Sequence, residues 1–187
     1  MEDFLKKCIK MLEDCGIDYV IVGGIAAIYY GEPRSTADVD VILRISEEDE
    51  EVIESFVRCV ERHGFEILGG KKEIITALRE KSHFSIFQKN EAFWIDAQGV
   101  YTRLNELALE GRRRMKIFGV EGWLQGPEDL IIAKLTYYLS NRDEKDVMAI
   151  LSNSMHLIDR DRLERLALEF KVLERLRSIA QQLDIQI

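Results

Sequence analysis

The chain has 187 residues, of which 47% are hydrophobic and 32% charged, and it contains 2 prolines. This composition is typical of a folded globular protein, and it excludes a disordered or fibrous one. The formal charge of -8 argues against a protein that wraps duplex DNA, because that function needs a net basic face. No apolar run approaches the roughly 20 residues of a membrane helix, and the N-terminus lacks a signal-peptide pattern. We therefore expect a cytoplasmic protein without membrane or duplex-DNA partners.

The first 68 residues predict alternating helices and strands. Helical spacing of apolar residues predicts helices over 2–15 and 25–30, and a third that starts at Ser46 and stops at Gly64. Apolar or alternating runs predict strands over 17–22, 37–43 and 65–68. The glycines Gly23 and Gly24 separate the first strand from the short helix that follows it.

The rest of the chain divides near residue 125. Residues 73–81 fit neither a helix nor a strand cleanly and stay open. Hairpins are predicted from 84–87 with 92–97 and from 113–118 with 121–124, on either side of a helix over 101–109. Beyond Gly126 the pattern is helical: a first helix from Pro127 to Tyr138, then 143–151, 159–170 and 172–183. We expect an α/β core over residues 1–125 and a helical region over 126–187.

The cysteines form no recognisable redox or metal motif. Cys8, Cys15 and Cys59 are an odd set without a CxxC pair, and all three lie in segments predicted to be helical. We interpret them as reduced thiols of the core.

A basic strip, Arg112 to Arg114 with Lys116 just beyond, interrupts this acidic chain. One interpretation is a surface that guides a polyanion toward a cleft. The other is a solvated strand edge that its charges protect from pairing. Both interpretations stay open at this point.

Two aspartates in the strand over 37–43 indicate a metal site. Residues i and i+2 of a strand share a face, so Asp38 and Asp40 lie about 6.6 Å apart along the backbone. Two carboxylates that repel each other within an apolar strand are stabilised by Mg²⁺ or Mn²⁺, which favour oxygen ligands. Asp96, on a neighbouring predicted strand, would be a third ligand and would allow two ions.

Residues just before these aspartates have side chains or backbone suited to phosphate. Gly23 and Gly24 expose backbone N–H groups at the start of a helix, without a Cβ in the way. Arg34, Ser35 and Thr36 lie between that turn and the aspartates, and Arg34 can contact a phosphate through two donors. The ligand expected here is a polyphosphate.

The segment V-I-V-G-G-I-A-A-I-Y-Y-G-E-P-R-S-T-A-D-V-D-V-I-L, residues 20–43, resembles the signature of the polymerase-beta-type nucleotidyltransferase superfamily. Within it, the segment is most similar to the AbiEii-type toxins and related nucleotidyltransferase-like domains. This resemblance implies a mixed β-sheet core with flanking helices, an α/β or α+β fold, followed by a helical C-terminal part. It also implies Mg²⁺-dependent transfer of NMP from an NTP to an acceptor hydroxyl, with Asp38, Asp40 and Asp96 as catalytic metal ligands.

Further motifs extend the resemblance to about residue 150. Asp129 to Lys134 is similar to the D-x4-K motif of that group, and Asp146, after Lys145, stands where a downstream aspartate is expected. The resemblance implies that Lys134 contacts the triphosphate. The alternative is that Lys134 is a helix lysine whose stem lies along apolar surface. For Asp146 the alternative is that its charge only stabilises the start of a helix. The run K-N-E-A-F-W-I-D before Asp96 departs from the K-x4-K-D spacing of the group.

Several functions share these motifs. The acceptor could be an RNA 3′ end, a protein or a small molecule, and the enzyme could be the toxin of a toxin–antitoxin system, with a cognate antitoxin as partner. The alternative is a catalytically inactive nucleotidyltransferase-fold binding module or antitoxin. A metal-dependent phosphohydrolase is disfavoured because His63, His83 and His156 accompany no aspartate motif.

Overall fold

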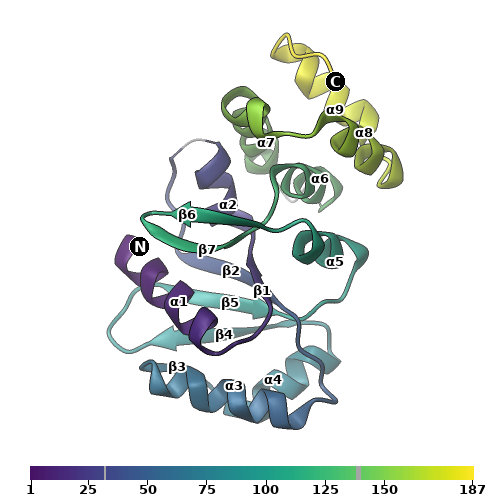
Figure 1. The fold of residues 1–187 in the computed structure, drawn as a ribbon. Coiled ribbons are helices and arrows are strands. Elements are labelled where there is room, and N and C mark those ends of the chain that lie inside the picture. Colours follow the sequence, from purple (N-terminus) through teal and green to yellow (C-terminus); the bar gives the residue numbers. More distant parts are fainter. Residues whose placement is uncertain (32, 138–139) are drawn as a thin grey trace.

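The computed structural model describes residues 1–31, 33–137 and 140–187, so Tyr138, predicted on an apolar helix face, lies outside the described residues. The fold has a twisted mixed sheet with helices beside it, and a group of helices formed by the C-terminal residues lies beyond one end (Figure 1). This arrangement confirms the predicted α/β class with flanking helices.

The strands are β1 (Tyr19–Ile21), β2 (Asp38–Leu43), β3 (Phe65–Ile67), β4 (His83–Gln88), β5 (Trp94–Gln98), β6 (Arg113–Ile117) and β7 (Val120–Leu124). Within the described residues they form one seven-stranded sheet in the order β3-β4-β5-β2-β1-β7-β6. The pairs β2/β5 and β1/β7 are parallel, and the other neighbours are antiparallel. The two predicted hairpins are therefore present as β4/β5 and β6/β7.

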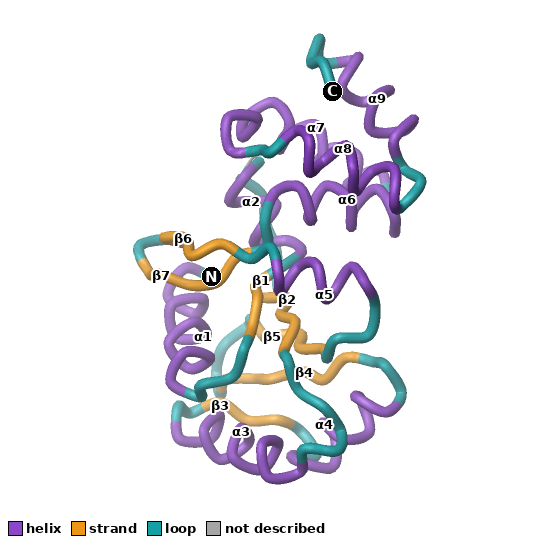
Figure 2. The backbone as a smooth tube through the Cα atoms, turned by 45° about the vertical axis from the view of Figure 1, so that its right-hand side comes forward, coloured by secondary structure: helices purple, strands orange, loops and turns teal. Residues whose placement is uncertain are grey.

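The helices are α1 (Glu2–Asp14), α2 (Gly23–Tyr30), α3 (Glu50–Arg62), α4 (Gly70–Arg79), α5 (Arg103–Glu110), α6 (Pro127–Tyr137), α7 (Asn141–Ser154), α8 (Arg160–Glu169) and α9 (Leu173–Gln182). Both views place α3 and α4 beside β3 and β4, and place α6 to α9 together at the other end of the molecule (Figures 1 and 2). The open segment 73–81 is largely helical, within α4.

The helix predicted to start at Ser46 begins later, at Glu50. The Ser46 hydroxyl accepts a hydrogen bond from the backbone N–H of Glu48 at 3.3 Å, within a turn. Because Ser46 serves this turn, it does not cap the helix, and the residue directly before α3 is Asp49. The sequence prediction was wrong by one helical turn.

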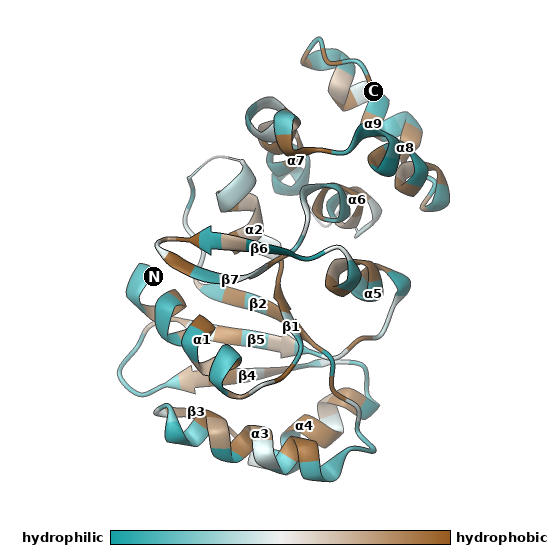
Figure 3. Cartoon of the chain, viewed as in Figure 1, coloured by the Kyte–Doolittle hydropathy of each residue, from teal (hydrophilic) through white to brown (hydrophobic). Residues whose placement is uncertain are grey.

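Burial follows the period of each element. In β2, Val39 and Val41 are buried whereas Asp38 and Asp40 are only partly covered, as the alternation predicts. Figure 3 shows hydrophobic residues gathered in the strands and on the helix surfaces that face them. The hydrophobic effect thus fixes which face of β2 carries the aspartates, because a slip of one residue would bury them.

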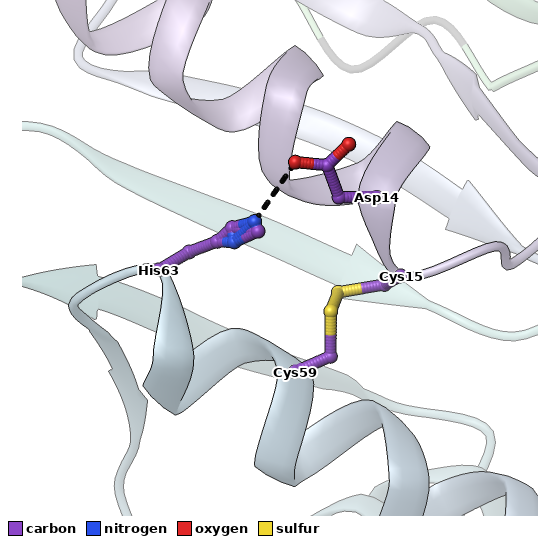
Figure 4. The surroundings of a disulfide bond; sticks show 4 residues. All are labelled: Asp14, Cys15, Cys59 and His63. Atoms are coloured by element: carbon purple, nitrogen blue, oxygen red, sulfur yellow. Dashed lines mark hydrogen bonds and ion pairs between the residues drawn. A yellow bond between two sulfur atoms is a disulfide. The ribbon is translucent and has the colours of Figure 1, made fainter.

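The cysteine prediction is wrong for two of the three residues. Cys15, just after α1, and Cys59, in α3, form a disulfide, and His63 lies next to it with its Nε2 3.1 Å from Asp14 Oδ2 (Figure 4). Cys8 is buried and free. The spacing of apolar residues correctly predicted both helices, but the pattern within one helix does not show that α1 and α3 pack together.

The helical region contacts the sheet-bearing part through α2. Helices α6 and α7 both pack against α2, and α6 also packs against α5. The proposed division at residue 125 stays a prediction. Among the described residues, no helix is long and apolar enough to cross a membrane.

Candidate active site

The parallel pairing of β2 with β5 brings three carboxylates together. Asp40 lies directly opposite Asp96 in the register, and Asp38 lies two residues earlier on the same face of β2. One oxygen from each of Asp38, Asp40 and Asp96 lies within 4.8 Å of the others. The structure therefore assembles the three aspartates that the sequence singled out.

Each carboxylate is oriented by a hydrogen bond from a different segment. Asp38 Oδ1 accepts from Thr36 Oγ1 at 2.7 Å, and Asp96 Oδ1 accepts from Ser85 Oγ at 2.8 Å. Asp40 Oδ2 accepts from the backbone N–H of Gly24 at 3.3 Å. Each bond engages one of the two oxygens of its carboxylate.

Electrostatics disfavour the charged form of Asp40. Burial raises the pKa of Asp40, and the neighbouring charges of Asp38 and Asp96 raise it further, against the Gly24 N–H and His83, which lower it. A cluster of oxygen donors with excess negative charge suits Mg²⁺ or Mn²⁺, which prefer such ligands. The donor chemistry of these residues therefore fits a divalent cation.

The two glycines make the close approach of α2 to β2 sterically feasible. Gly23 has a φ of +59°, and a Cβ there would overlap the Asp40 carboxylate. A Cβ at Gly24 would lie 2.9 Å from Thr36 Oγ1. The Gly24 N–H, which we expected to face phosphate, donates to Asp40, so the turn positions a metal-ligand candidate in addition to any contact with a nucleotide.

Lys134 and Arg34 meet at one buried aspartate. Asp146 accepts from Arg34 Nε and Nη2, each at 3.1 Å, and its Oδ2 lies 2.7 Å from Lys134 Nζ. Lys134 also contacts Asp143 Oδ1 at 3.1 Å. Asp146 is only 7% exposed, so it does more than start a helix: it joins α7 to α6 and to the segment before β2.

Other motif residues lie away from the carboxylates. The Asp129 side chain accepts from Arg162 Nη2 at 2.6 and 2.8 Å and thereby joins α6 to α8, while Lys145 is exposed. Arg34, Ser35 and Thr36 line a separate pocket of about 650 Å³ next to α2. Of these three, Thr36 contacts the acidic cluster directly.

A cavity of about 680 Å³ opens onto the acidic cluster. The residues that line it include Gly23, Asp40, Asp96 and Lys134. His83 of β4 also lines it, so the expectation that the histidines accompany no aspartate site is wrong for His83. Sequence alternation held a signal for this, because His83 and Ser85 share a face of β4, and Ser85 lies opposite Asp96 in β5.

The basic strip is largely neutralised within the chain. Arg112 pairs with Asp18 at 2.9 Å, Arg113 donates to both carboxylate oxygens of Glu128 at 2.8 Å, and Arg114 pairs with Glu13. Arg112 and Arg114 also lie over the ring of Trp123, at 4.8 and 5.3 Å from its centroid. The arginines therefore stabilise the β6/β7 hairpin and its neighbours, which weighs against a polyanion-guiding surface.

Solved structures with the same fold include nucleotidyltransferases. ANT(2″)-Ia in complex with adenylyl-2″-tobramycin aligns with a TM-score of 0.61 at 14% identity, over 91% of this chain and 96% of that one. An antigenic nucleotidyltransferase-like protein from Paracoccidioides brasiliensis gives 0.61 at 14% identity, over 100% and 93%. The lincosamide antibiotic adenylyltransferase LnuA, lincomycin-bound, gives 0.53 at 15%, over 82% and 96%. At these identities the likeness establishes the fold.

No curated protein sequence matches the chain significantly. The narrower resemblance to AbiEii-type toxins stays a prediction. Residues 4–185, nearly the whole chain, match the family described as "Nucleotidyltransferase of unknown function (DUF6036)". The chain therefore belongs to this nucleotidyltransferase family.

Proposed function

We propose that the protein transfers NMP from an NTP to an acceptor hydroxyl, with Mg²⁺ or Mn²⁺ held by Asp38, Asp40 and Asp96. The observation that carries this proposal is the convergence of three carboxylate oxygens within 4.8 Å at the β2/β5 pair, beside a cavity. A divalent cation bound there supplies charge neutralisation to the phosphates and Lewis acidity at the reacting phosphorus.

The side chains around the cavity have distinct roles in this proposal. Lys134 binds the triphosphate. The segment on which the triphosphate rests is held or oriented by Gly23, Gly24, Arg34, Ser35 and Thr36. Asp96 accepts the proton of the acceptor hydroxyl, whose oxygen attacks the α-phosphorus. The bond between the α-phosphorus and the oxygen bridging to the β-phosphate breaks, and pyrophosphate leaves. Ser85 keeps one oxygen of Asp96 engaged and so fixes the orientation of the other.

Lys134 must be released from its partners before it can serve a triphosphate fully. It now contacts Asp143 and Asp146, and it is about 9% exposed. A triphosphate carries more negative charge than either carboxylate, so its approach favours a partial exchange of partners. Arg34 then stays with Asp146 and keeps that carboxylate paired.

A small molecule is the acceptor we propose first. The arginines of the basic strip are paired within the chain, which leaves little free positive charge for RNA. The solved complexes of ANT(2″)-Ia and LnuA contain adenylyl-2″-tobramycin and lincomycin, both small molecules. Transfer to RNA or protein, as by a toxin with a cognate antitoxin, is the second candidate, and it is supported by the R-S-T-A-D-V-D segment.

Titration calorimetry tests the proposal. ATP, GTP, CTP and UTP are titrated with and without Mg²⁺ into the wild type and into the variant that carries Asp38→Ala and Asp40→Ala. We expect Mg²⁺-dependent binding in the wild type only. If none of the four nucleotides binds, the chain is instead a non-catalytic module of the fold.

An NTP labelled at its α-phosphate then identifies the acceptor class. Incubation with a panel of hydroxylated small molecules, with tRNA and with cell protein reports which fraction gains the label. Label in small molecules supports the first candidate, and label in RNA or protein supports the toxin-like one.

A further inference from the structure

Gln125 is an unexplained buried side chain next to the candidate site. It lies between the end of β7 and the start of α6 and is 3% exposed. Its backbone N–H donates to Ile21 O at 2.9 Å, which anchors its position beside β1. Its side chain lines the cavity that also contains Asp40, Asp96 and Lys134.

Apart from the Tyr30 hydroxyl and His63 Nδ1, the other buried polar and charged side chains of the described residues have partners. Glu128 pairs with Arg113, Asp129 with Arg162, Asp146 with Arg34 and Lys134, Ser154 donates to Tyr30 O, and Asn105 accepts from the N–H groups of Tyr101 and Thr102. The Gln125 amide makes no hydrogen bond with residues 1–31, 33–137 and 140–187, and it is not among the fully enclosed unpaired groups, which are the Tyr30 hydroxyl and His63 Nδ1. Because Gln125 lines the cavity, a ligand or solvent there can supply the partner that a buried amide needs.

The cavity that Gln125 lines also has walls that suit a flat apolar ring. Helices α5 and α6 contribute Leu104, Leu130 and Ala133 to it, and Tyr101 and Tyr137 add aromatic surface. Apolar and aromatic walls with a few polar groups are typical of sites that bind small ligands. The volume of about 680 Å³ is also in the range of such sites.

In an NTP, the nucleobase is the only part that has this chemistry. Its triphosphate belongs with Lys134 and the carboxylate-bound cation, at the polar part of the same cavity. Its ring can lie between the apolar walls, where stacking on aromatic side chains is favourable. The base edge is then left for a side chain with hydrogen-bonding capacity.

We propose that Gln125 reads the edge of the nucleobase and selects adenine, an inference that rests on the proposed function. A glutamine amide presents one donor group beside one acceptor oxygen. Adenine offers the complement, the N6 amino group beside the N7 acceptor, whereas the corresponding guanine edge carries two acceptors and its N1 and N2 edge carries two donors. Gln125 therefore accepts from N6, donates to the adjacent ring nitrogen, and discriminates against guanine.

The test compares nucleotides and variants by titration calorimetry in the presence of Mg²⁺. The ligands are ATP, GTP and inorganic tripolyphosphate, which lacks a base. The variants are Gln125→Met, which keeps the length but removes both hydrogen-bonding groups, and Gln125→Glu, which offers two acceptors. Gln88→Met is the matched control, because Gln88 lies at the end of β4 and accepts from Lys7 outside the cavity. Circular dichroism shows whether each variant is folded.

We expect the wild type to bind ATP about tenfold or more tightly than GTP, as one good bidentate contact allows. Gln125→Met should lose that preference and bind tripolyphosphate as the wild type does, and Gln125→Glu should shift the preference toward GTP. Gln88→Met should behave as the wild type.

Two results would overturn the inference while leaving the proposed function intact. One is equal binding of ATP and GTP by the wild type, and the other is an unchanged ATP preference in a folded Gln125→Met or Gln125→Glu protein. A wild type that binds neither nucleotide nor tripolyphosphate with Mg²⁺ would overturn the proposed function and this inference together.

Discussion

Asp40 is the residue whose charge the fold opposes most clearly in the acidic cluster. It is partly buried, its carboxylate faces Asp38 and Asp96, and its pKa is raised by burial and by those charges. A site that binds a cation often keeps such repulsion in the metal-free state, because the cation relieves it. Function and stability therefore make opposite demands on this residue.

Asp40→Asn should separate these demands. The amide keeps the shape and can still accept from the Gly24 N–H, but it removes the buried charge. We expect cation binding to fall strongly and the free energy of unfolding in metal-free buffer at pH 7 to stay equal or rise by about 1 kcal/mol. Since the folded-state pKa of Asp40 is raised, its stability cost grows as the pH rises above the ordinary 3.8. The gain in the free energy of unfolding should therefore vanish near pH 3. Denaturant unfolding at pH 3 and pH 7 measures it, and a large loss of unfolding free energy at pH 7 would contradict the prediction.

Gly23→Ala tests whether the turn serves the carboxylate. The residue has a φ of +59°, and its new methyl group would overlap Asp40. We expect a loss of about 2–3 kcal/mol in the free energy of unfolding together with lost nucleotide binding, because left-handed backbone and displacement of Asp40 both contribute. Gly16→Ala is the control, with a φ of +65° and open space around it. It should lower the free energy of unfolding by only about 1 kcal/mol and leave nucleotide binding unchanged. Equal effects of the two changes would show that Gly23 has no special role beside Asp40.

At the scale of elements, ion pairs with buried carboxylates join the C-terminal helices to one another and to the sheet. Arg113 with Glu128 joins β6 to α6, Arg162 with Asp129 joins α8 to α6, and Asp146 joins α7 to α6. Such pairs are costly to break, because removal of one partner leaves the other buried and charged.

Arg162→Met should show this cost with a defined pH dependence. Burial raises the pKa of Asp129 to about 6 even though Arg162 lowers it. In the wild type this group therefore makes the free energy of unfolding fall as the pH rises from about 4 to about 6. Without Arg162 the pKa rises further, so we expect a loss of about 3 kcal/mol at pH 7 and a much smaller loss at pH 5, where Asp129 is protonated.

The variant with both Arg162→Met and Asp129→Asn is the control for that experiment. It should recover much of the stability at pH 7, because it no longer carries an unpaired buried charge, and it should lack the pH dependence. A loss that is equal at pH 5 and pH 7 in the single variant would show that packing, rather than charge, explains the effect.

The disulfide gives a second prediction about the elements. Cys15 and Cys59 are 44 residues apart in sequence, and a cross-link over such a loop stabilises by about 4 kcal/mol in the chain-entropy model. We expect dithiothreitol to lower the denaturation midpoint of the wild type by a corresponding amount, and to leave nucleotide affinity unchanged because the bond joins α1 to α3. The Cys15→Ser variant should have the lower midpoint already and should not respond to the reductant. A wild type that is insensitive to dithiothreitol would contradict this prediction.

For the whole molecule, local sequence patterns predicted the helices and strands better than they predicted which of these elements lie next to one another. The alternation of β2 correctly placed Asp38 and Asp40 on one face, whereas Gly23 and Gly24, predicted as a turn before the helix, are the first two residues of α2. The parallel pairing of β2 with β5 depends on contacts distant in sequence, so the register of Asp40 with Asp96 came only with the structure. The same limit explains the missed disulfide, whereas the late start of α3 has a local cause, the turn in which Ser46 accepts from the Glu48 N–H.

The part of the candidate site that lies within one segment of the chain could be predicted from the sequence. Residues 23–40 supply two of the three carboxylates and the turn that orients one of them. His83, Gln125 and Tyr137 enter the cavity from three other elements or junctions, and no motif joins them in the sequence. The ion-pair partners of Arg34 and Lys134 likewise depend on how α6 and α7 pack on α2.

The proposed function requires above all that Asp38, Asp40 and Asp96 bind divalent cations together with a nucleotide. Electron paramagnetic resonance can follow Mn²⁺ binding in the presence of a non-hydrolysable ATP analogue, in the wild type and in the Asp38→Ala, Asp40→Ala variant. We predict that the wild type binds about two Mn²⁺ ions in the presence of the analogue, as a two-metal site would, and that the variant loses this binding while it stays folded. Equal Mn²⁺ binding by the two folded proteins would contradict the account.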